Sequence, residues 1–109
     1  MTTGPDANKP NAITIHINQD LEEIVPGFLE NRRRDVQILE TALQQNNLAQ
    51  ILIIGHQMKG DGGGYGFDNI SKMGTALEQA AARKDREAIR RHTAELANFL
   101  AHVTVVYRR

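Results

Sequence analysis

The sequence predicts an all-α protein, an antiparallel up-and-down four-helix bundle that follows a short N-terminal extended segment and a short helix. In four successive segments the apolar residues recur at helical spacing, so each segment can form a helix with one buried face. The connections between these segments are short, which favours antiparallel neighbours. The chain of 109 residues has room for a single domain with one modest core. We therefore expect a flexible tail over residues 1–12 and a bundle domain over residues 13–109.

The segments at the two ends of the chain have a different pattern. The tail is polar and contains prolines and a glycine, so it cannot bury enough apolar surface to offset the entropy of ordering it. Ile13–Ile17 alternates apolar and polar residues, as a strand does, and Val103–Tyr107 is the similar segment with which it could pair. Either the two segments form a small ribbon, or the last helix simply continues through Tyr107.

The first long helix follows a possible capping box, Asp20 with Glu23 three residues later. This signal opens a short helical stretch that Pro26 must interrupt or restart, since proline is tolerated in a first helical turn. The apolar stripe of the helix extends to about Gln45 and consists of Phe28, Leu29, Val36, Leu39 and Leu43.

The basic run Arg32–Arg34 lies within this first helix. Successive helical residues are separated by about 100° around the axis, so the three side chains cannot all face one way. They either form a solvated face with intrahelical pairs to Glu30 and Asp35, or one or two of them meet an acidic partner surface.

The second helix follows the break at Asn46–Asn47, with Gln50 as a possible cap. Its expected inward residues are Leu48, Ile51, Leu52, Gly55 and Met58. A rival interpretation makes Ile51–Ile54 a buried strand that leads into a phosphate-binding loop. The glycines that follow match no dinucleotide-binding pattern, and Asp61 stands where a P-loop requires serine or threonine.

The third and fourth helices follow a glycine-rich stretch. Glycine costs about 1 kcal/mol in a helix interior relative to alanine, so we expect the second helix to fray or end within Gly62–Gly66. Asp68 or Asn69 can cap the third helix, and Asp85 starts the fourth. The third stripe is Ile70, Met73, Leu77, Ala80, Ala81 and Lys84, and the fourth is Ile89, His92, Leu96, Phe99, Leu100 and Val103.

The stretch Gly55–Gly66 sets one histidine and one lysine beside a run of small residues. His56 and Lys59 are three residues apart and share one side of a helix, with Gly60 one turn beyond the histidine. An exposed imidazole is largely neutral near neutral pH and can act as a nucleophile, and a lysine beside it supplies a point charge for phosphoryl oxygens.

The motif formed by His56, Lys59, Gly60 and Gly66 resembles that of the histidine-containing phosphotransfer (HPt) domain of bacterial two-component phosphorelays. The resemblance covers about Ile24 to Val103, because three further segments also resemble helices of that family in order: Phe28–Arg32, Leu77–Ala81 and Leu96–Leu100. The chain departs from the family pattern at Asp61–Gly62, where such domains commonly carry small hydroxyl or alanine residues.

The resemblance implies that His56 is the phosphoacceptor, through its Nε2 atom, and that Lys59 stabilises the charge of the phosphoryl group. It implies a histidine phosphocarrier that passes the group to or from the aspartate of a response-regulator receiver domain. The expected docking residues for that receiver are Ile53, Gln57, Gly60, Asp61 and Gly64, and Gly66 is expected to be structural. Glu78 or Gln79, on the next helix, could orient the other ring nitrogen of His56. The alternative is a helical interaction module that is never phosphorylated and docks through the same surface.

The partners implied are a receiver domain, a hybrid histidine kinase, or both. We expect no ATP-dependent kinase activity, no cofactor and no metal in the isolated protein, with Mg²⁺ on the receiver. His92 and Glu95 have the spacing of a metal-binding pair, but a di-metal bundle needs further inward carboxylates. His92 is therefore expected to be packed, and His16 and His102 have no supporting context.

Charge and composition limit the remaining function classes. Thirteen basic and thirteen acidic residues balance, so no global field attracts nucleic acid or an anionic membrane. The absence of cysteine excludes disulfides and thiolate metal sites. No apolar run is long enough to span a bilayer, and no signal peptide is recognisable. We expect a monomer in the cytoplasm.

Overall fold

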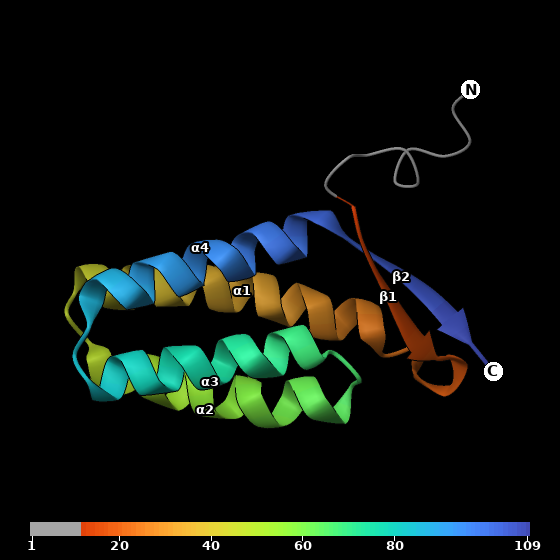
Figure 1. The fold of residues 1–109 in the computed structure, drawn as a ribbon, viewed down its shortest axis with the longest axis horizontal. Helices are drawn as coiled ribbons and strands as arrows, with labels where there is room; N and C mark the ends of the chain where they lie inside the picture. Colours follow the sequence, from red (N-terminus) through yellow and green to blue (C-terminus); the bar gives the residue numbers. More distant parts are fainter. Residues whose placement is uncertain (1–11) are drawn as a thin grey trace.

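The computed structural model describes residues 12–109, which form four long helices and a short ribbon of two strands (Figure 1). The elements in chain order are β1 (Ile13–Asn18), a 3₁₀ turn η1 (Gln19–Leu21), α1 (Val25–Gln44), α2 (Leu48–Gly64), α3 (Asp68–Ala82), α4 (Arg86–His102) and β2 (Val103–Arg108). Apart from Ala12, the predicted flexible tail lies outside the described residues. The rival interpretation of Ile51–Ile54 as a strand is wrong, because this segment lies inside α2.

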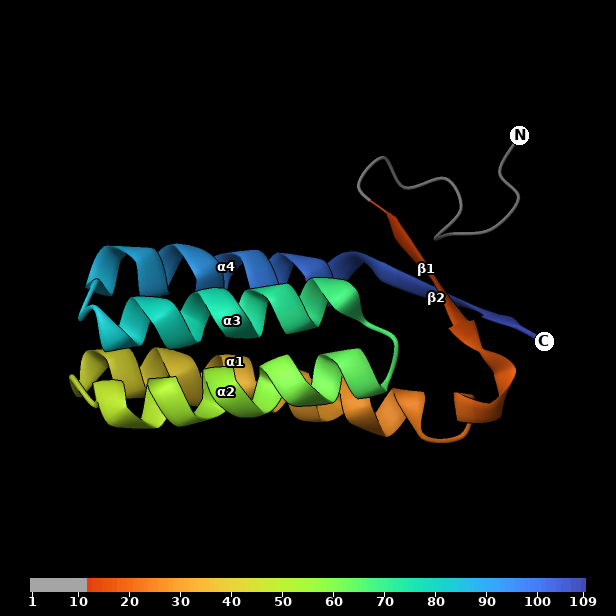
Figure 2. The ribbon, with the colours of Figure 1, turned by 60° about the horizontal axis from the view of Figure 1, so that its bottom comes forward.

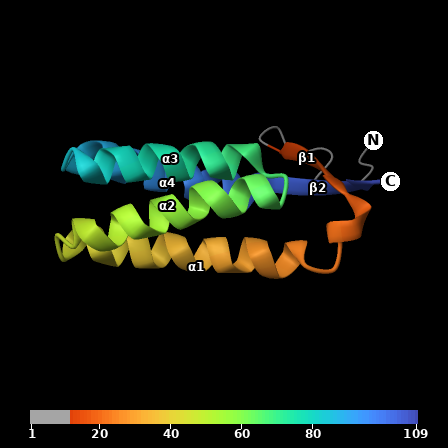
Figure 3. The same ribbon diagram turned by 90° about the horizontal axis from the view of Figure 1, so that it is seen from below.

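The four helices lie lengthwise beside one another (Figures 1 and 3). The α1–α2 and α3–α4 connections lie at one end of the molecule, and the α2–α3 connection lies at the end that carries the strands. Within the described residues no helix is both long and apolar enough to cross a membrane.

One apolar core fills the space between the helices. Its fully buried members come from all four of them and include Leu39, Ile51, Met58, Ile70, Leu77, Ile89 and Leu96. Three stripe predictions need correction. Lys84 lies beyond the end of α3 at φ +60°, and Val103 lies in β2 rather than in the last helix. In α4 Thr93 rather than its neighbour His92 is buried, and its hydroxyl donates to the Ile89 carbonyl at 2.8 Å.

Three of the predicted helix caps are wrong, each by a few positions. Asn18 rather than Asp20 caps the first turn, since its side chain accepts from the Asp20 amide. Asn47 rather than Gln50 caps α2, and its Oδ1 accepts from the Gln50 amide at 3.2 Å. The cap position of α3 is Phe67, which has no side-chain capping bond. The predicted cap Asp85 is confirmed, because its carboxylate accepts from the Ala88 amide.

α2 ends at Gly64, within the glycine run as expected, and it remains helical through Gly62 because close packing requires a glycine there. A Cβ at Gly62 would lie 2.5 Å from the Ser71 amide nitrogen, so the α2 and α3 backbones touch at this point. Gly62 is buried while Gly63 and Gly64 are exposed. The packing of α2 on α3 therefore maintains the helix through residues that would otherwise favour fraying.

The two ends of the chain pair as a parallel ribbon, β1 with β2, with Ile13 opposite Val103 and Ile17 opposite Tyr107 (Figure 2). The last helix therefore ends at His102 and does not continue to Tyr107. The alternating apolar residues of both strands pack toward the core, and Ile17 is only 2% exposed. Parallel strands need a long crossover connection, which the four helices supply.

Candidate functional site

His56 lies on the exposed side of α2 and contacts one carboxylate from α3. Its Nδ1 atom is 3.0 Å from Oε2 of Glu78, while 67% of the histidine side chain is exposed. An ionised carboxylate can only accept a hydrogen bond, so Nδ1 donates and carries the ring proton. In the neutral ring the lone pair then lies on Nε2, the nitrogen that Glu78 does not contact.

Lys59 completes a group of three charged or polar side chains. Its Nζ atom lies 4.0 Å from Oε1 of Glu78, and half of its side chain is exposed. Glu78 therefore lies between the imidazole and the ammonium and is itself three-quarters buried. The Lys59 carbonyl accepts a bond from the Ser71 hydroxyl at 2.7 Å, which fixes this part of α2 against α3.

The closeness of Glu78 to His56 depends on two glycines at the α2–α3 contact. A Cβ at Gly55 would lie 2.7 Å from the Glu78 amide nitrogen, and a Cβ at Gly74 would lie 2.5 Å from the Lys59 amide nitrogen. Real Cβ atoms do not approach backbone this closely, so any larger residue would push the helices apart. Gly55 and Gly74 therefore allow the Glu78 side chain to reach the histidine.

The predicted docking residues lie on the exposed side of α2. Ile53 is 54% exposed, and Gln57, Gly60, Asp61 and Gly64 are exposed as well. A Cβ placed on Gly60 or Gly64 would meet no atom within 4 Å. The surface on this side of His56 is therefore low and nearly free of obstructing side chains. We call Ile53, Gln57, Gly60 and Gly64, together with His56, the His56 surface.

Gly66 has the left-handed conformation that favours glycine, with φ +85°. A Cβ here would also lie 3.1 Å from the Ile17 side chain, so this position joins the α2–α3 turn to β1. Gln79 is exposed on α3. Of the two residues expected to orient His56, Glu78 is the one that bonds to it.

The arginine run forms the intrahelical pairs that the sequence suggested. Arg32 Nε bonds to Asp35 at 2.8 Å, and Arg33 pairs with Glu30 at 3.3 Å. Burial raises the pKa of the Asp35 carboxyl above its ordinary value, although the neighbouring Arg32 acts in the opposite direction. Sequence reasoning missed that Arg32 also approaches Asp61 of α2, with Nη1 3.8 Å from Oδ2.

Each of the other three histidines forms a hydrogen bond through its Nδ1 atom. His92 Nδ1 bonds to Glu95 at 2.9 Å, His102 Nδ1 donates to the Asn98 carbonyl at 2.8 Å, and His16 Nδ1 accepts from Arg108 at 2.7 Å. Across residues 12–109 no group of three or more histidine, aspartate or glutamate side chains has an arrangement that could hold a metal ion.

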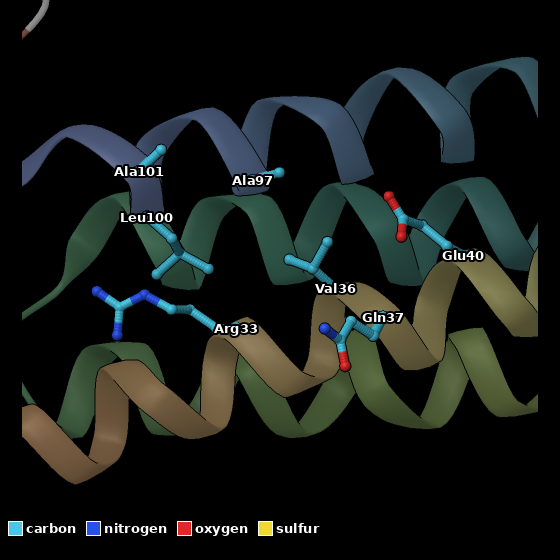
Figure 4. A pocket seen from close by; sticks show the side chains of 7 residues that line it. All are labelled: Arg33, Val36, Gln37, Glu40, Ala97, Leu100 and Ala101. Atoms are coloured by element: carbon cyan, nitrogen blue, oxygen red, sulfur yellow. The ribbon is translucent and has the colours of Figure 1, made fainter.

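A separate groove lies between α1 and α4 (Figure 4). Val36, Leu100 and the alanines at 97 and 101 form its apolar part, and Arg33 and Glu40 lie on its edge. None of the residues of the His56 surface lines it.

The described residues thus form a helical domain in which an exposed histidine bonds to a carboxylate of the next helix. The family model described as Hpt domain matches residues 23–104. The chain therefore belongs to the Hpt domain family. Hpt domains are phosphocarriers of phosphorelays rather than kinases, and they interact with response regulators and histidine kinases. Comparisons with curated proteins and with solved structures found no match.

Proposed function

We propose that this protein carries a phosphoryl group on Nε2 of His56, which it accepts from or passes to the aspartate of a response-regulator receiver domain. The bond between His56 Nδ1 and Glu78 is the observation that carries the proposal. It places the proton on the nitrogen that faces α3 and leaves the nucleophilic nitrogen to the exposed side of the ring.

The transfer begins when the Nε2 lone pair approaches the phosphorus of an aspartyl phosphate. A P–N bond forms as the P–O bond breaks, and the electron pair of that bond leaves with the aspartate carboxylate. The imidazole ring becomes positively charged and keeps its Nδ1 proton. Glu78 stabilises this charge through the bond that it already accepts, as a carboxylate does for an imidazolium in other histidine-dependent reactions.

Lys59 supports the phosphoryl group rather than the ring. The equatorial oxygens gather charge in the loose transition state of phosphoryl transfer, and an ammonium nearby stabilises it. Lys59 is half exposed and its ammonium lies 4.0 Å from Glu78, so the ammonium can turn toward the phosphoryl oxygens. Glu78 then keeps its hydrogen bond with His56. The protein needs no cofactor of its own for this step, and the receiver supplies Mg²⁺.

The unit that performs this function is residues 13–109, an antiparallel up-and-down bundle that acts as a monomer. The positions of the three interhelical connections in Figure 1 support the alternating direction of the helices.

The receiver docks on the His56 surface and Asp61, where Ile53 provides an exposed apolar centre and Gly60 and Gly64 leave room for the incoming loop.

Transfer of radiolabelled phosphoryl from a phosphorylated receiver tests the proposal. We expect one acid-labile, alkali-stable label on the wild-type protein and none on His56→Gln. Lys59→Ala should fold normally and bind the receiver but accept the label about tenfold more slowly, because it removes charge stabilisation and keeps the nucleophile. Full labelling of His56→Gln would refute the proposal. A stable complex without any label would instead support the alternative, a docking module that is never phosphorylated.

A further inference from the structure

We propose that an acidic hollow beside the His56 surface receives an arginine or lysine side chain of the receiver domain, and so helps to select the receiver. The inference rests on the proposed function, since it presumes a receiver at His56. The hollow lies between the start of α1 and the end of α2, and the residues that matter for its chemistry are Glu23, Ile24, Phe28, Arg32, Asp61 and Tyr65.

Two aromatic rings line the hollow. The Phe28 and Tyr65 rings stack with centroids 4.3 Å apart, and Ile24, which is 49% exposed, lies beside them. Long basic side chains lay their methylene stems along such apolar surface and keep the charged head in water. Phe28 itself is only 5% exposed and the Arg32 guanidinium already lies 4.8 Å from its ring centroid, so Tyr65 and Ile24 provide the apolar surface for an incoming stem.

The charge of the hollow is negative. Glu23 and Asp61 are exposed carboxylates, and Arg32 is the only cation among the described residues that line the hollow. The charge of Arg32 is compensated by Asp35, which does not line the hollow, because Arg32 Nε bonds to Asp35 at 2.8 Å; only 12% of the Arg32 side chain is exposed. Asp61 is 54% exposed and lies 3.8 Å from that guanidinium, so it remains accessible to a second cation. A cationic group therefore fits the hollow, and an anionic one does not.

The hollow is continuous with the surface that the receiver must cover. On an ideal helix the Cα atoms of His56 and Asp61, five positions apart, are separated by about 9 Å. Five helical positions also turn about 140° around the axis, and the exposed Ile53 and Gln57 of the His56 surface project between His56 and Asp61. A domain that covers Ile53 and Gln57 as well as His56 therefore reaches the edge of the hollow at Asp61.

The test uses the full chain with His56 phosphorylated by phosphoramidate, a small donor whose P–N bond breaks with release of ammonia. The labelled protein is mixed with a panel of purified receiver domains, and the fastest acceptor is used. We expect Glu23→Lys to slow transfer at least tenfold at subsaturating receiver. The control is Glu40→Lys, which makes the same charge reversal at the groove of Figure 4, and this variant should transfer at the wild-type rate. Equal rates for Glu23→Lys and wild type would overturn the inference, as would equal slowing by Glu40→Lys.

The transfer rates separate this inference from the proposed function. If the wild-type protein transfers to no receiver, the proposed function fails and the inference fails with it. If the wild type transfers and Glu23→Lys transfers equally well, only the role of the hollow is refuted. A second measurement places a photo-cross-linking amino acid at Gly27, which lines the hollow and where an added Cβ would meet no atom within 4 Å. The cross-link identifies the molecule that occupies the hollow. A cross-linked receiver peptide that contains arginine or lysine supports the inference. A peptide from a second copy of this chain, or a receiver peptide without either residue, contradicts it.

Discussion

Glu78 gives His56 its chemical state as well as its position. Its carboxylate accepts a hydrogen bond from Nδ1 at 3.0 Å, and its other oxygen lies 4.0 Å from the Lys59 ammonium. One side chain therefore contacts both residues of the predicted motif. A histidine with two-thirds of its side chain in water would otherwise exchange between tautomers. The bond to Glu78 therefore leaves the lone pair on Nε2, the nitrogen that we propose as the nucleophile.

Substitution of Glu78 separates its charge from its hydrogen bond. Glu78→Gln keeps an acceptor for Nδ1 and should slow transfer from the receiver about tenfold, because the ring charge that forms loses its counter-charge. Glu78→Ala should slow it further and also mix the tautomers. Nitrogen NMR of the His56 ring measures the tautomer, and Gln79→Ala, a change at an exposed neighbour, serves as the control. Wild-type transfer by Glu78→Gln would show that the carboxylate has no part in the reaction.

The motif was sufficient to predict that His56 and Lys59 lie together on one helix, because their spacing depends on that helix alone. The choice between Glu78 and Gln79 required the structure, since it depends on how α3 is rotated against α2. The Arg32–Asp61 contact was missed for the same reason, because it joins two helices whose relative rotation is set by packing.

At the scale of the elements, α2 shows why a glycine can be favourable inside a helix. Propensity alone predicts fraying, with about 1 kcal/mol lost at each interior glycine. The structure shows Gly55, Gly62 and Gly74 at points where the α2 and α3 backbones touch, so their small size is required by packing. Helical periodicity predicted all four long helices, but it could not indicate which glycines are packed. The caps of η1 and α2 were misplaced because several polar residues near each start could have served, and the α3 cap was misplaced because Phe67 makes no side-chain capping bond.

Two neighbouring glycines provide a matched test of this packing. Gly62→Ala should destabilise the protein by roughly 1–3 kcal/mol, because the new Cβ meets the Ser71 amide nitrogen at 2.5 Å and α3 must move. Gly63→Ala meets no atom within 4 Å and should stabilise the helix by up to about 1 kcal/mol. Urea denaturation of both variants gives the two free energies of unfolding. Equal stability of the two variants would contradict the role assigned to the α2–α3 contact.

On the scale of the whole molecule, the parallel ribbon joins the two ends of the described chain. Alternating apolar residues indicated that Ile13–Ile17 and Val103–Tyr107 could pair, but the sequence could not decide between this pairing and a longer last helix. Such distant segments can pair only if the four helices bring the end of the chain back beside its beginning. In the structure β1 and β2 meet at the end that also carries Gly66 and the α2–α3 turn. The ribbon thus lies at the end of the molecule toward which α2 runs.

Docking of a receiver is a property of the whole surface, and Ile53 tests where that surface is centred. Ile53→Asp should change the free energy of unfolding by less than roughly 1 kcal/mol, because the side chain is already 54% exposed. It should weaken receiver binding by about 1–3 kcal/mol, the range of a side chain central to an interface. Ile38→Asp, at a 41% exposed isoleucine of α1, is the matched control and should bind normally. Normal binding by Ile53→Asp would move the docking surface elsewhere around His56.

The atom that carries the phosphoryl group is the most direct test of phosphotransfer through Nε2 of His56. The protein, labelled with ¹⁵N in its histidines, is phosphorylated by a receiver and examined by NMR for coupling between phosphorus and a ring nitrogen. We expect one coupled nitrogen, Nε2 of His56, with the Nδ1 proton retained on the side of Glu78. Coupling to Nδ1 of His56, coupling to another histidine, or a phosphoryl group bound to oxygen instead of nitrogen would contradict it.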